Sequence, residues 1–258
     1  MKTFKLSIIL IFLFLKTFSK AQSTVILLCD YKDSGGTYNE VVLTFYSCIV
    51  PTTFIISQPK VKISSINDES NKNLVKAIQA NDGTIKYFSN SFGDFFPNVI
   101  YISVINSKLL EIRRENLEKF EQLKVIYLCN NQLEFLERDL FVKNKLLSFV
   151  YLNDNNFKFV DSATFNGLFY LEYLSMENAG CIHQQARNRH AVINLTKKAA
   201  NQCNDEIVID DIVKRDQKEF LESCNEEIFI KVCHLDSNRK ISFFNQLFEE
   251  KCQKLIKT

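Results

Sequence analysis

Residues 123–157 decide the fold, through the segments LKVIYLCNNQL (123–133) and LLSFVYLNDNNF (146–157). Five columns recur at offsets 0, 3, 5, 8 and 10, first as Leu123, Ile126, Leu128, Asn131 and Leu133, and 24 residues later as Leu147, Val150, Leu152, Asn155 and Phe157. Side chains at offsets 3 and 5 alternate along a strand, so both point to one side. The asparagine lies where the chain leaves the strand, and its amide can satisfy backbone groups of neighbouring coils. One coil cannot bury its apolar side alone, so the coils must stack.

The same register extends in both directions along the chain. The apolar columns are Val75, Val99, Leu123, Leu147 and Leu171 at offset 0, Ile78, Ile102, Ile126, Val150 and Leu174 at offset 3, and Ala80, Val104, Leu128, Leu152 and Met176 at offset 5. The asparagine column is weaker, because Gly83, Ser107 and Ala179 replace it in the outer coils. A fixed period with the pattern L-x-x-L-x-L-x-x-N-x-L matches the leucine-rich repeat signature. The alternative is an ordinary α/β domain whose apolar residues happen to align.

The repeat predicts an α/β solenoid of about five 24-residue coils over residues 75–181, each with a short parallel strand at offsets 2 to 6. Residues 22–74 precede the coils and are expected to form an N-terminal cap with a hairpin. The strand-like runs TVILLCDY and NEVVLTFYSCIV flank the turn-prone DSGGT (33–37), and VKISSI is a further candidate edge strand. Residues 182–203 are expected to form a C-terminal cap with a helix. The charged tail, residues 204–258, shows helical spacing of apolar residues.

Residues 1–21, MKTFKLSIILIFLFLKTFSKA, have the composition of a secretory signal peptide. The apolar run from Leu6 to Leu15 is short of the roughly 20 residues that a spanning helix needs. We therefore expect a secreted, extracellular protein that begins near Gln22 and has no membrane span. Removing the four lysines of this segment would change the formal charge from +2 to near −2. Neither value suggests nucleic acid or an anionic membrane as the main partner.

All eight cysteines follow residue 21, which suits disulfide formation in an oxidising compartment. Cys29 and Cys48 precede the coils, and Cys181 and Cys203 follow them, where an array must cover its apolar ends. We expect the disulfides Cys29–Cys48 and Cys181–Cys203. Cys129 lies inside the array; it could be a free thiol, pair with a tail cysteine or join another chain. The pairing of the tail cysteines, Cys224, Cys233 and Cys252, stays open, with a disulfide within the tail favoured.

The coils, the cysteine-bounded hairpin and the Cys181/Cys203 ending resemble secreted leucine-rich repeat proteins of arthropods. The resemblance covers residues 22–203 and rests on VIYISVINSKL, LKVIYLCNNQL, LLSFVYLNDNNF and LEYLSMENAGC. It implies a curved solenoid whose strands line a concave face used for protein recognition. Some members of the family act in innate immunity and pair through a cysteine-bearing helical C-terminus. The tail of this chain has cysteines and helical spacing but no sustained heptads.

Side chains at offsets 2, 4 and 6 point away from the core, so their identity is informative about binding. They include an aromatic cluster on the expected concave face: Tyr101, Tyr127, Phe149, Tyr151 and Tyr173. Aromatic rings bring large contact area, and tyrosine adds a polar tip, as interface hot spots do. The cluster therefore predicts a binding surface for another protein. The alternatives are that the tail docks there, or that these residues only suit strands.

The sequence contains two further candidate sites, one for glycosylation and one for zinc. Asn194-Leu195-Thr196 is an acceptor sequon for N-glycosylation. Cys181, His183, His190 and Cys203 could in principle bind zinc, but their spacing matches no common finger and a disulfide is expected instead. We expect no metal and no cofactor.

Catalytic motifs are missing from the sequence, which has no G-x-S-x-G, H-E-x-x-H, Walker or G-x-G-x-x-G pattern. We therefore expect a non-enzymatic binding protein. The alternative is a structural or assembly protein that forms homo- or hetero-oligomers through the tail and its cysteines.

Overall fold

The computed structural model describes residues 24–205 except 39–40, 59–60, 68–69 and 71. The chain divides into two units, residues 1–204 and 205–258, and only the first is described below. The expected signal peptide and nearly all of the expected helical tail lie outside the described residues. Within those residues, no helix is long and apolar enough to cross a lipid bilayer.

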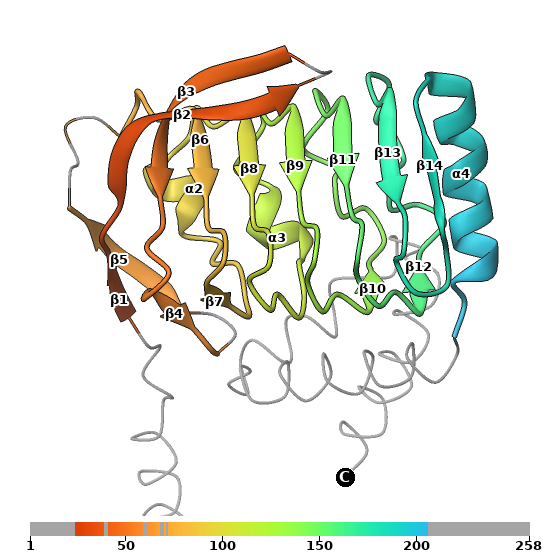
Figure 1. Ribbon diagram of the computed structural model, residues 1–258, viewed down its shortest axis with the longest axis horizontal. Helices are drawn as coiled ribbons and strands as arrows, with labels where there is room; N and C mark the ends of the chain where they lie inside the picture. The colour runs from red at the N-terminus through yellow and green to blue at the C-terminus, as the bar shows by residue number, and fades with distance from the viewer. Residues whose placement is uncertain (1–23, 39–40, 59–60, 68–69, 71, 206–258) are drawn as a thin grey trace, which may run out of the picture. The chain divides into compact units, whose positions relative to one another are not determined.

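Five short strands form the centre of the sheet and run parallel: β6 (Ala77–Gln79), β8 (Tyr101–Ser103), β9 (Val125–Tyr127), β11 (Phe149–Tyr151) and β13 (Tyr173–Met176) (Figure 1). Each residue pairs with the residue 24 positions along the chain, as in the series Ala77, Tyr101, Val125, Phe149, Tyr173. The period of the sequence is therefore the period of the structure. This register defines a leucine-rich repeat solenoid.

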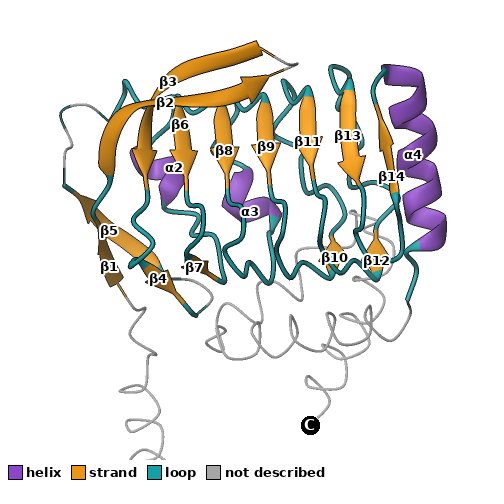
Figure 2. Ribbon diagram, viewed as in Figure 1, coloured by secondary structure: helices purple, strands orange, loops and turns teal. Residues whose placement is uncertain are grey.

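The core lies on one side of these strands and contains the predicted apolar columns. The offset-3 and offset-5 side chains are almost completely buried, Ile126 and Leu128 among them. The return side of the coils contributes the largest buried side chains, the phenylalanines Phe92, Phe96, Phe120, Phe141 and Phe157. Short elements order this side: β4 (Ile55–Ile56) pairs with β7 (Thr84–Ile85), β10 (Phe135–Leu136) pairs with β12 (Phe159–Val160), and α2 (Phe92–Phe95) and α3 (Arg114–Leu117) are single helical turns (Figure 2).

The asparagines at offset 8 connect consecutive coils through buried hydrogen bonds. Asn131 Oδ1 accepts the backbone N–H groups of Ser107 and Leu109 at 3.1 and 3.0 Å. Its Nδ2 donates to the carbonyls of Val104, Leu128 and Cys129. Asn155 makes the same kind of contacts one coil further on, including one from the Leu133 N–H. The expected role of this column is therefore confirmed.

A third buried asparagine, outside the offset-8 column, was not predicted from the sequence. Asn144 lies on the return side, and its Nδ2 donates to the carbonyls of Leu117 and Phe120, both at 2.9 Å. Leu117 is the last residue of α3 and Phe120 follows that helix, so both carbonyls belong to the preceding coil. Asn144 thus joins coils on the return side as Asn131 joins them beside the sheet.

The N-terminal end carries an antiparallel hairpin, but its turn is not where the sequence predicts it. Strand β2 (Asp30–Tyr38) runs straight through DSGGT and pairs with β3 (Val41–Ile49) up to Tyr38–Val41. Ser34 explains why turn-prone residues remain in the strand. Its Oγ lies 2.6 Å from Ser47 Oγ on β3 and accepts a hydrogen bond from Gln79 Nε2 on β6 at 2.7 Å. The polar residues therefore connect three neighbouring strands.

The rest of the N-terminal cap lies beside this hairpin. The Cys29–Cys48 disulfide joins the residue before β2 to β3. Strand β1 (Thr24–Leu27) does not join the hairpin and instead pairs in parallel with β5 (Lys62–Ile66), which contains the predicted VKISSI strand. The large sheet therefore begins at β2, in the order β14-β13-β11-β9-β8-β6-β3-β2.

The C-terminal end is covered by a strand and a helix. Strand β14 (Gln184–Ala186) pairs antiparallel with β13, and α4 (Arg189–Gln202) follows it beside the end of the sheet (Figure 1). Asn188 caps the helix, since its side chain accepts the Ala191 N–H. Val192, Leu195 and Ala199 form the buried face of α4. The Cys181–Cys203 disulfide joins the last coil to the residue that ends the helix.

The asparagine column gives a stability test. We expect Asn131→Ala to lower the free energy of unfolding by about 2–4 kcal/mol, because it leaves several buried backbone groups without a partner. The neighbouring Gln132 is exposed, so Gln132→Ala is the matched control and should change stability by less than about 0.5 kcal/mol. Urea unfolding of both variants measures the difference, and equal stabilities would contradict the assigned hydrogen bonds.

Candidate functional site

The face of the sheet opposite the core carries a row of aromatic rings, which we call the aromatic face. Alternation along each strand places these side chains away from the apolar columns. The rings of Phe45, Tyr101, Tyr127, Tyr151 and Tyr173 follow one another across the sheet, with centroids 5.6, 5.5, 4.0 and 4.7 Å apart. The pair Tyr127–Tyr151 is almost parallel, with 7° between the ring planes.

Two of the five predicted binding residues are buried rather than open. Tyr101 is 6% exposed and Phe149 is 5% exposed, and together with Ala77 and Val125 they form a second apolar cluster on this face. These offset-2 side chains point away from the core as predicted, but they are packed on the opposite face and are not free to form a binding surface. The physical reason is that strands lie about 4.8 Å apart, so large rings on neighbouring strands cover one another.

Phe45 also covers part of Tyr101. Its role on this face was not predicted from the sequence. It lies on β3, beyond the small Ala77 of β6, and its ring stacks on Tyr101 of β8. A larger residue at position 77 would lie between these rings. No repeat signal could identify Phe45, because it belongs to the cap.

The accessible part of the row consists of Tyr127, Tyr151 and Tyr173, which are all partly exposed. The row ends at β14, where the Tyr173 hydroxyl donates to Gln185 Oε1 at 2.8 Å. The Arg187 guanidinium carbon lies 6.0 Å from the centre of the Tyr173 ring, within the range of a cation–π contact. The site thus has three tyrosines in its centre and a cation at one end.

Burial controls the ionisation of this surface. Desolvation raises the pKa of Tyr127, and its hydrogen bond with Tyr151 raises it further. Burial likewise raises the pKa of Tyr151. Cys129 follows Tyr127 on the same face as a free thiol, and burial raises its pKa to about 11. All three groups are therefore neutral at physiological pH, and the face offers hydroxyl and thiol groups rather than negative charge.

A second column along the edge of this face was also missed. The residues at offset 7 are Asp82, Asn106, Asn130, Asp154 and Asn178, and all have positive φ, from 51° to 58°. Their side chains form bonds between coils, such as Asn106 Nδ2 to Asp82 Oδ1 and Asn178 Nδ2 to Asp154 Oδ1, both 2.8 Å. Asn and Asp tolerate the left-handed region best among non-glycine residues. Their recurrence every 24 residues was a signal in the sequence.

The other predicted site residues lie apart from the aromatic face. Asn194 is exposed on α4, and the Thr196 hydroxyl donates to the Ile193 carbonyl. His183 and His190 are exposed, and His183 Nδ1 accepts the Asn178 N–H at 2.7 Å. Cys181 and Cys203 are joined in a disulfide, which leaves neither thiolate to bind zinc.

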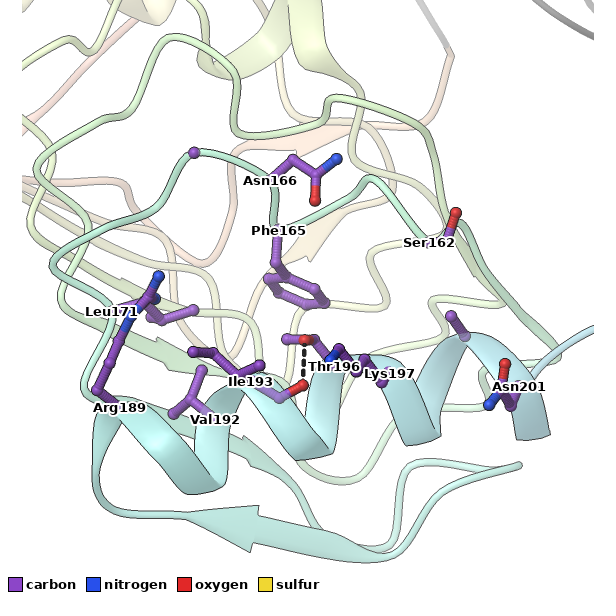
Figure 3. A pocket seen from close by; sticks show the side chains of 12 residues that line it. Ser162, Phe165, Asn166, Leu171, Arg189, Val192, Ile193, Thr196, Lys197 and Asn201 are labelled. Carbon is purple, nitrogen blue, oxygen red and sulfur yellow. Dashed lines mark hydrogen bonds between the residues drawn. The ribbon is translucent and has the colours of Figure 1, made fainter.

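One cavity lies between α4 and the return side of the last coil, with a volume of about 500 Å³ (Figure 3). Its lining includes the apolar residues Phe165, Leu171 and Val192 and the basic residues Arg189 and Lys197. No sequence prediction pointed to this place, because its two walls come from separate elements. It is distinct from the aromatic face, whose residues do not line it.

Comparison with known proteins finds matches among solved structures. No protein-family model and no curated protein matches the chain. Among solved structures it is similar to TLR13 in a complex with ssRNA13, with 20% identity over 45% of this chain and a TM-score of 0.40. It is also similar to a chain of the Toll–Spatzle complex from Drosophila, with 14% identity over 46% of this chain and a TM-score of 0.40. Each match covers 17% of the neighbour's chain, so the assignment as a leucine-rich repeat protein rests on the strand register.

The raised pKa of Cys129 predicts slow alkylation. A pKa of about 11 instead of the usual 9.0 leaves roughly a hundredfold less thiolate near neutral pH, and the thiolate is the reactive form. We expect the rate of modification of Cys129 by iodoacetamide to keep rising with pH beyond pH 9. Mass spectrometry of the Cys129 peptide, with glutathione as the reference thiol, measures this rate. A plateau below pH 9 would contradict the buried setting.

Proposed function

We propose that this chain is a secreted, non-enzymatic binding protein that recognises another protein through the aromatic face, which would be the concave face of the solenoid. The observation that carries the proposal is the row Tyr127, Tyr151 and Tyr173, three partly exposed rings with centroids 4.0 and 4.7 Å apart. Tyrosine at the centre of a rigid surface is typical of binding hot spots, because it offers large area at little entropic cost.

The rigid support of the row favours recognition without rearrangement. Each ring stands on a strand whose opposite side is packed into the core, as with Tyr127 between the buried Ile126 and Leu128. Neighbouring rings restrict one another further, since Tyr127 stacks on Tyr151 and Tyr151 contacts Tyr173. The side chains of this surface would therefore lose little conformational entropy when a partner binds.

Protein is a better candidate ligand than nucleic acid for a specific reason. Bases bind single-strand readers by stacking on open aromatic faces. Tyr127 and Tyr151 already stack on each other at 4.0 Å, so the faces between them are occupied and their edges and hydroxyls are what a ligand meets. The near-neutral formal charge also provides no strong attraction for phosphates.

Secretion is part of the same proposal. The signal-like composition of residues 1–21 and two disulfides at the ends of the solenoid both suit an oxidising, extracellular compartment. Asn194 is exposed on α4, which leaves room for a glycan at the sequon. We therefore propose that the mature chain is extracellular and glycosylated at Asn194.

The binding site is tested by removing its central rings. Capture from extracellular fluid supplies the partner, and we expect the double variant Tyr127→Ala/Tyr151→Ala to weaken its binding by about thirtyfold or more for each hot-spot ring. Neither residue belongs to the core on the opposite side, so thermal unfolding should remain cooperative. Leu74→Ala is the control, because Leu74 is 58% exposed and lies outside both the aromatic face and the cavity beside α4. Loss of binding with the control but not with the double variant would reject the site.

A second candidate is an assembly protein in which copies join through cysteines. The observation that favours it is Cys129, a free thiol on the aromatic face, in a chain whose three further cysteines lie in the tail. Electrophoresis of the secreted protein without reductant separates the two functions. We expect a band at the monomer position; a covalent oligomer that disappears with Cys129→Ser would instead support assembly.

A further inference from the structure

The cavity between α4 and residues 162–171 is an open groove, which we call the α4 groove. It is lined by Ser162, Phe165, Asn166, Gly167, Leu171, Arg189, Val192, Ile193, Thr196, Lys197, Ala200 and Asn201 (Figure 3). The helix residues extend from Arg189 to Asn201, about 18 Å along the axis at 1.5 Å per residue. The groove is thus long enough for a short extended peptide.

The apolar residues that line the groove are packed in place. Leu171 and Val192 are each 1% exposed, and the Phe165 ring stacks on Phe141 of the previous coil at 5.7 Å. Figure 3 shows the Phe165 side chain pointing toward the helix near Ile193 and Thr196. An apolar side chain placed here would be removed from water on several sides, which is favourable at about 25 cal/mol per Å².

Large apolar side chains also remain exposed beside the groove. Phe169 and Tyr170 are 77% and 61% exposed and lie in the chain between the lining residues Gly167 and Leu171. Ile193 on the opposite wall is 37% exposed. Contiguous exposed apolar groups around a groove are typical of interaction sites rather than of ordinary surface.

The charges of the groove have one sign. Among its twelve described lining residues, the charged ones are Arg189 and Lys197, and none is acidic. The Leu168 carbonyl accepts a hydrogen bond from Arg189 Nη1 and so holds the guanidinium in place. The Lys145 ammonium lies against Gly167, 2.7 Å from the position that a Cβ would take there. An occupant of this groove should therefore be acidic.

The spacing of Arg189 and Lys197 predicts the sequence pattern of a bound peptide. Arg189 and Lys197 are eight residues apart on α4, about 12 Å along the axis. In an extended peptide, residues i and i+4 point to the same side and lie about 13 Å apart, with residue i+2 between them on that side. The cations thus match two acidic side chains, and the apolar pair Phe165 and Val192 matches the side chain in the middle.

We infer that the α4 groove binds an extended segment of a partner protein with the pattern acidic-x-apolar-x-acidic. The two acidic side chains pair with Arg189 and Lys197, and the central apolar side chain packs on Phe165 and Val192. Phe169 and Tyr170 enlarge the contact beside the groove. This site is separate from the aromatic face and does not depend on the function proposed for that face.

The test uses the full secreted chain and a defined peptide, GESLSEG, immobilised through its C-terminus. Matched peptides change one property each: GKSLSKG reverses the charge, GESSSEG removes the apolar residue, and GESLSSSEG changes the spacing. We expect measurable binding to GESLSEG by surface plasmon resonance and at least threefold weaker binding to each of the others. Equal binding of GESLSEG and GESLSSSEG, or no binding to GESLSEG, would overturn the proposal.

Substitutions of two adjacent lysines test whether the peptide binds in the α4 groove. Lys197→Gln should weaken binding about two- to fivefold, the usual range for a partly exposed ion pair. Lys198→Gln removes the same charge from the next residue, whose ammonium instead contacts Gln184 Oε1 at 2.8 Å, and should leave binding unchanged. Equal losses in both variants would show non-specific attraction and reject the site. Binding that appears only in a chain with Glu206→Gln and Asp210→Asn would identify the chain's own EIVID stretch (206–210) as the occupant and also overturn the inference.

Discussion

The structure depends on one constraint: the backbone groups that one coil leaves unpaired must find partners in the next coil. The parallel strands satisfy part of this need, with each residue paired to the residue 24 positions along. Where the chain leaves the strand, the Asn131 side chain takes over, because one amide can accept two N–H groups and donate to several carbonyls. Asn144 does the same on the return side. A buried polar group without such a partner would be costly, so the spacing of the coils admits little variation.

The same constraint explains the two ends. A parallel stack exposes unpaired backbone and apolar columns at its first and last coil, and these need a cover that does not continue the repeat. At one end β3 pairs in parallel with β6 and antiparallel with β2, and at the other end β14 pairs antiparallel with β13. The Cys29–Cys48 disulfide lies within the first cover, and the Cys181–Cys203 disulfide joins the second cover to the last coil. The α4 groove lies where this helix meets the return side of the last coil.

The parts of the structure that repeat could be predicted from the sequence. The apolar columns and the asparagine column could be predicted because packing and hydrogen bonding impose them in every coil. The hairpin turn was misplaced, because Ser34 makes contacts with Ser47 and Gln79 that no local propensity includes. Alternation placed Tyr101 and Phe149 on the correct side but could not reveal that neighbouring rings and Phe45 cover them. The α4 groove was beyond prediction, since it arises only when Phe165 and Val192 come together in the fold.

The aromatic face follows from the strand register, because the register that stacks the coils also stacks the aromatic rings. Tyr101 and Phe149 are buried within this face, and Tyr127, Tyr151 and Tyr173 remain partly exposed. Hydroxyl-radical footprinting of the purified chain, alone and with a partner captured from extracellular fluid, tests this division most directly. The account predicts that Tyr127, Tyr151 and Tyr173 are oxidised in the free chain and protected in the complex, while Tyr101 and Phe149 react little in either. Strong oxidation of Tyr101, or a complex in which the three accessible tyrosines stay as reactive as before, would contradict it.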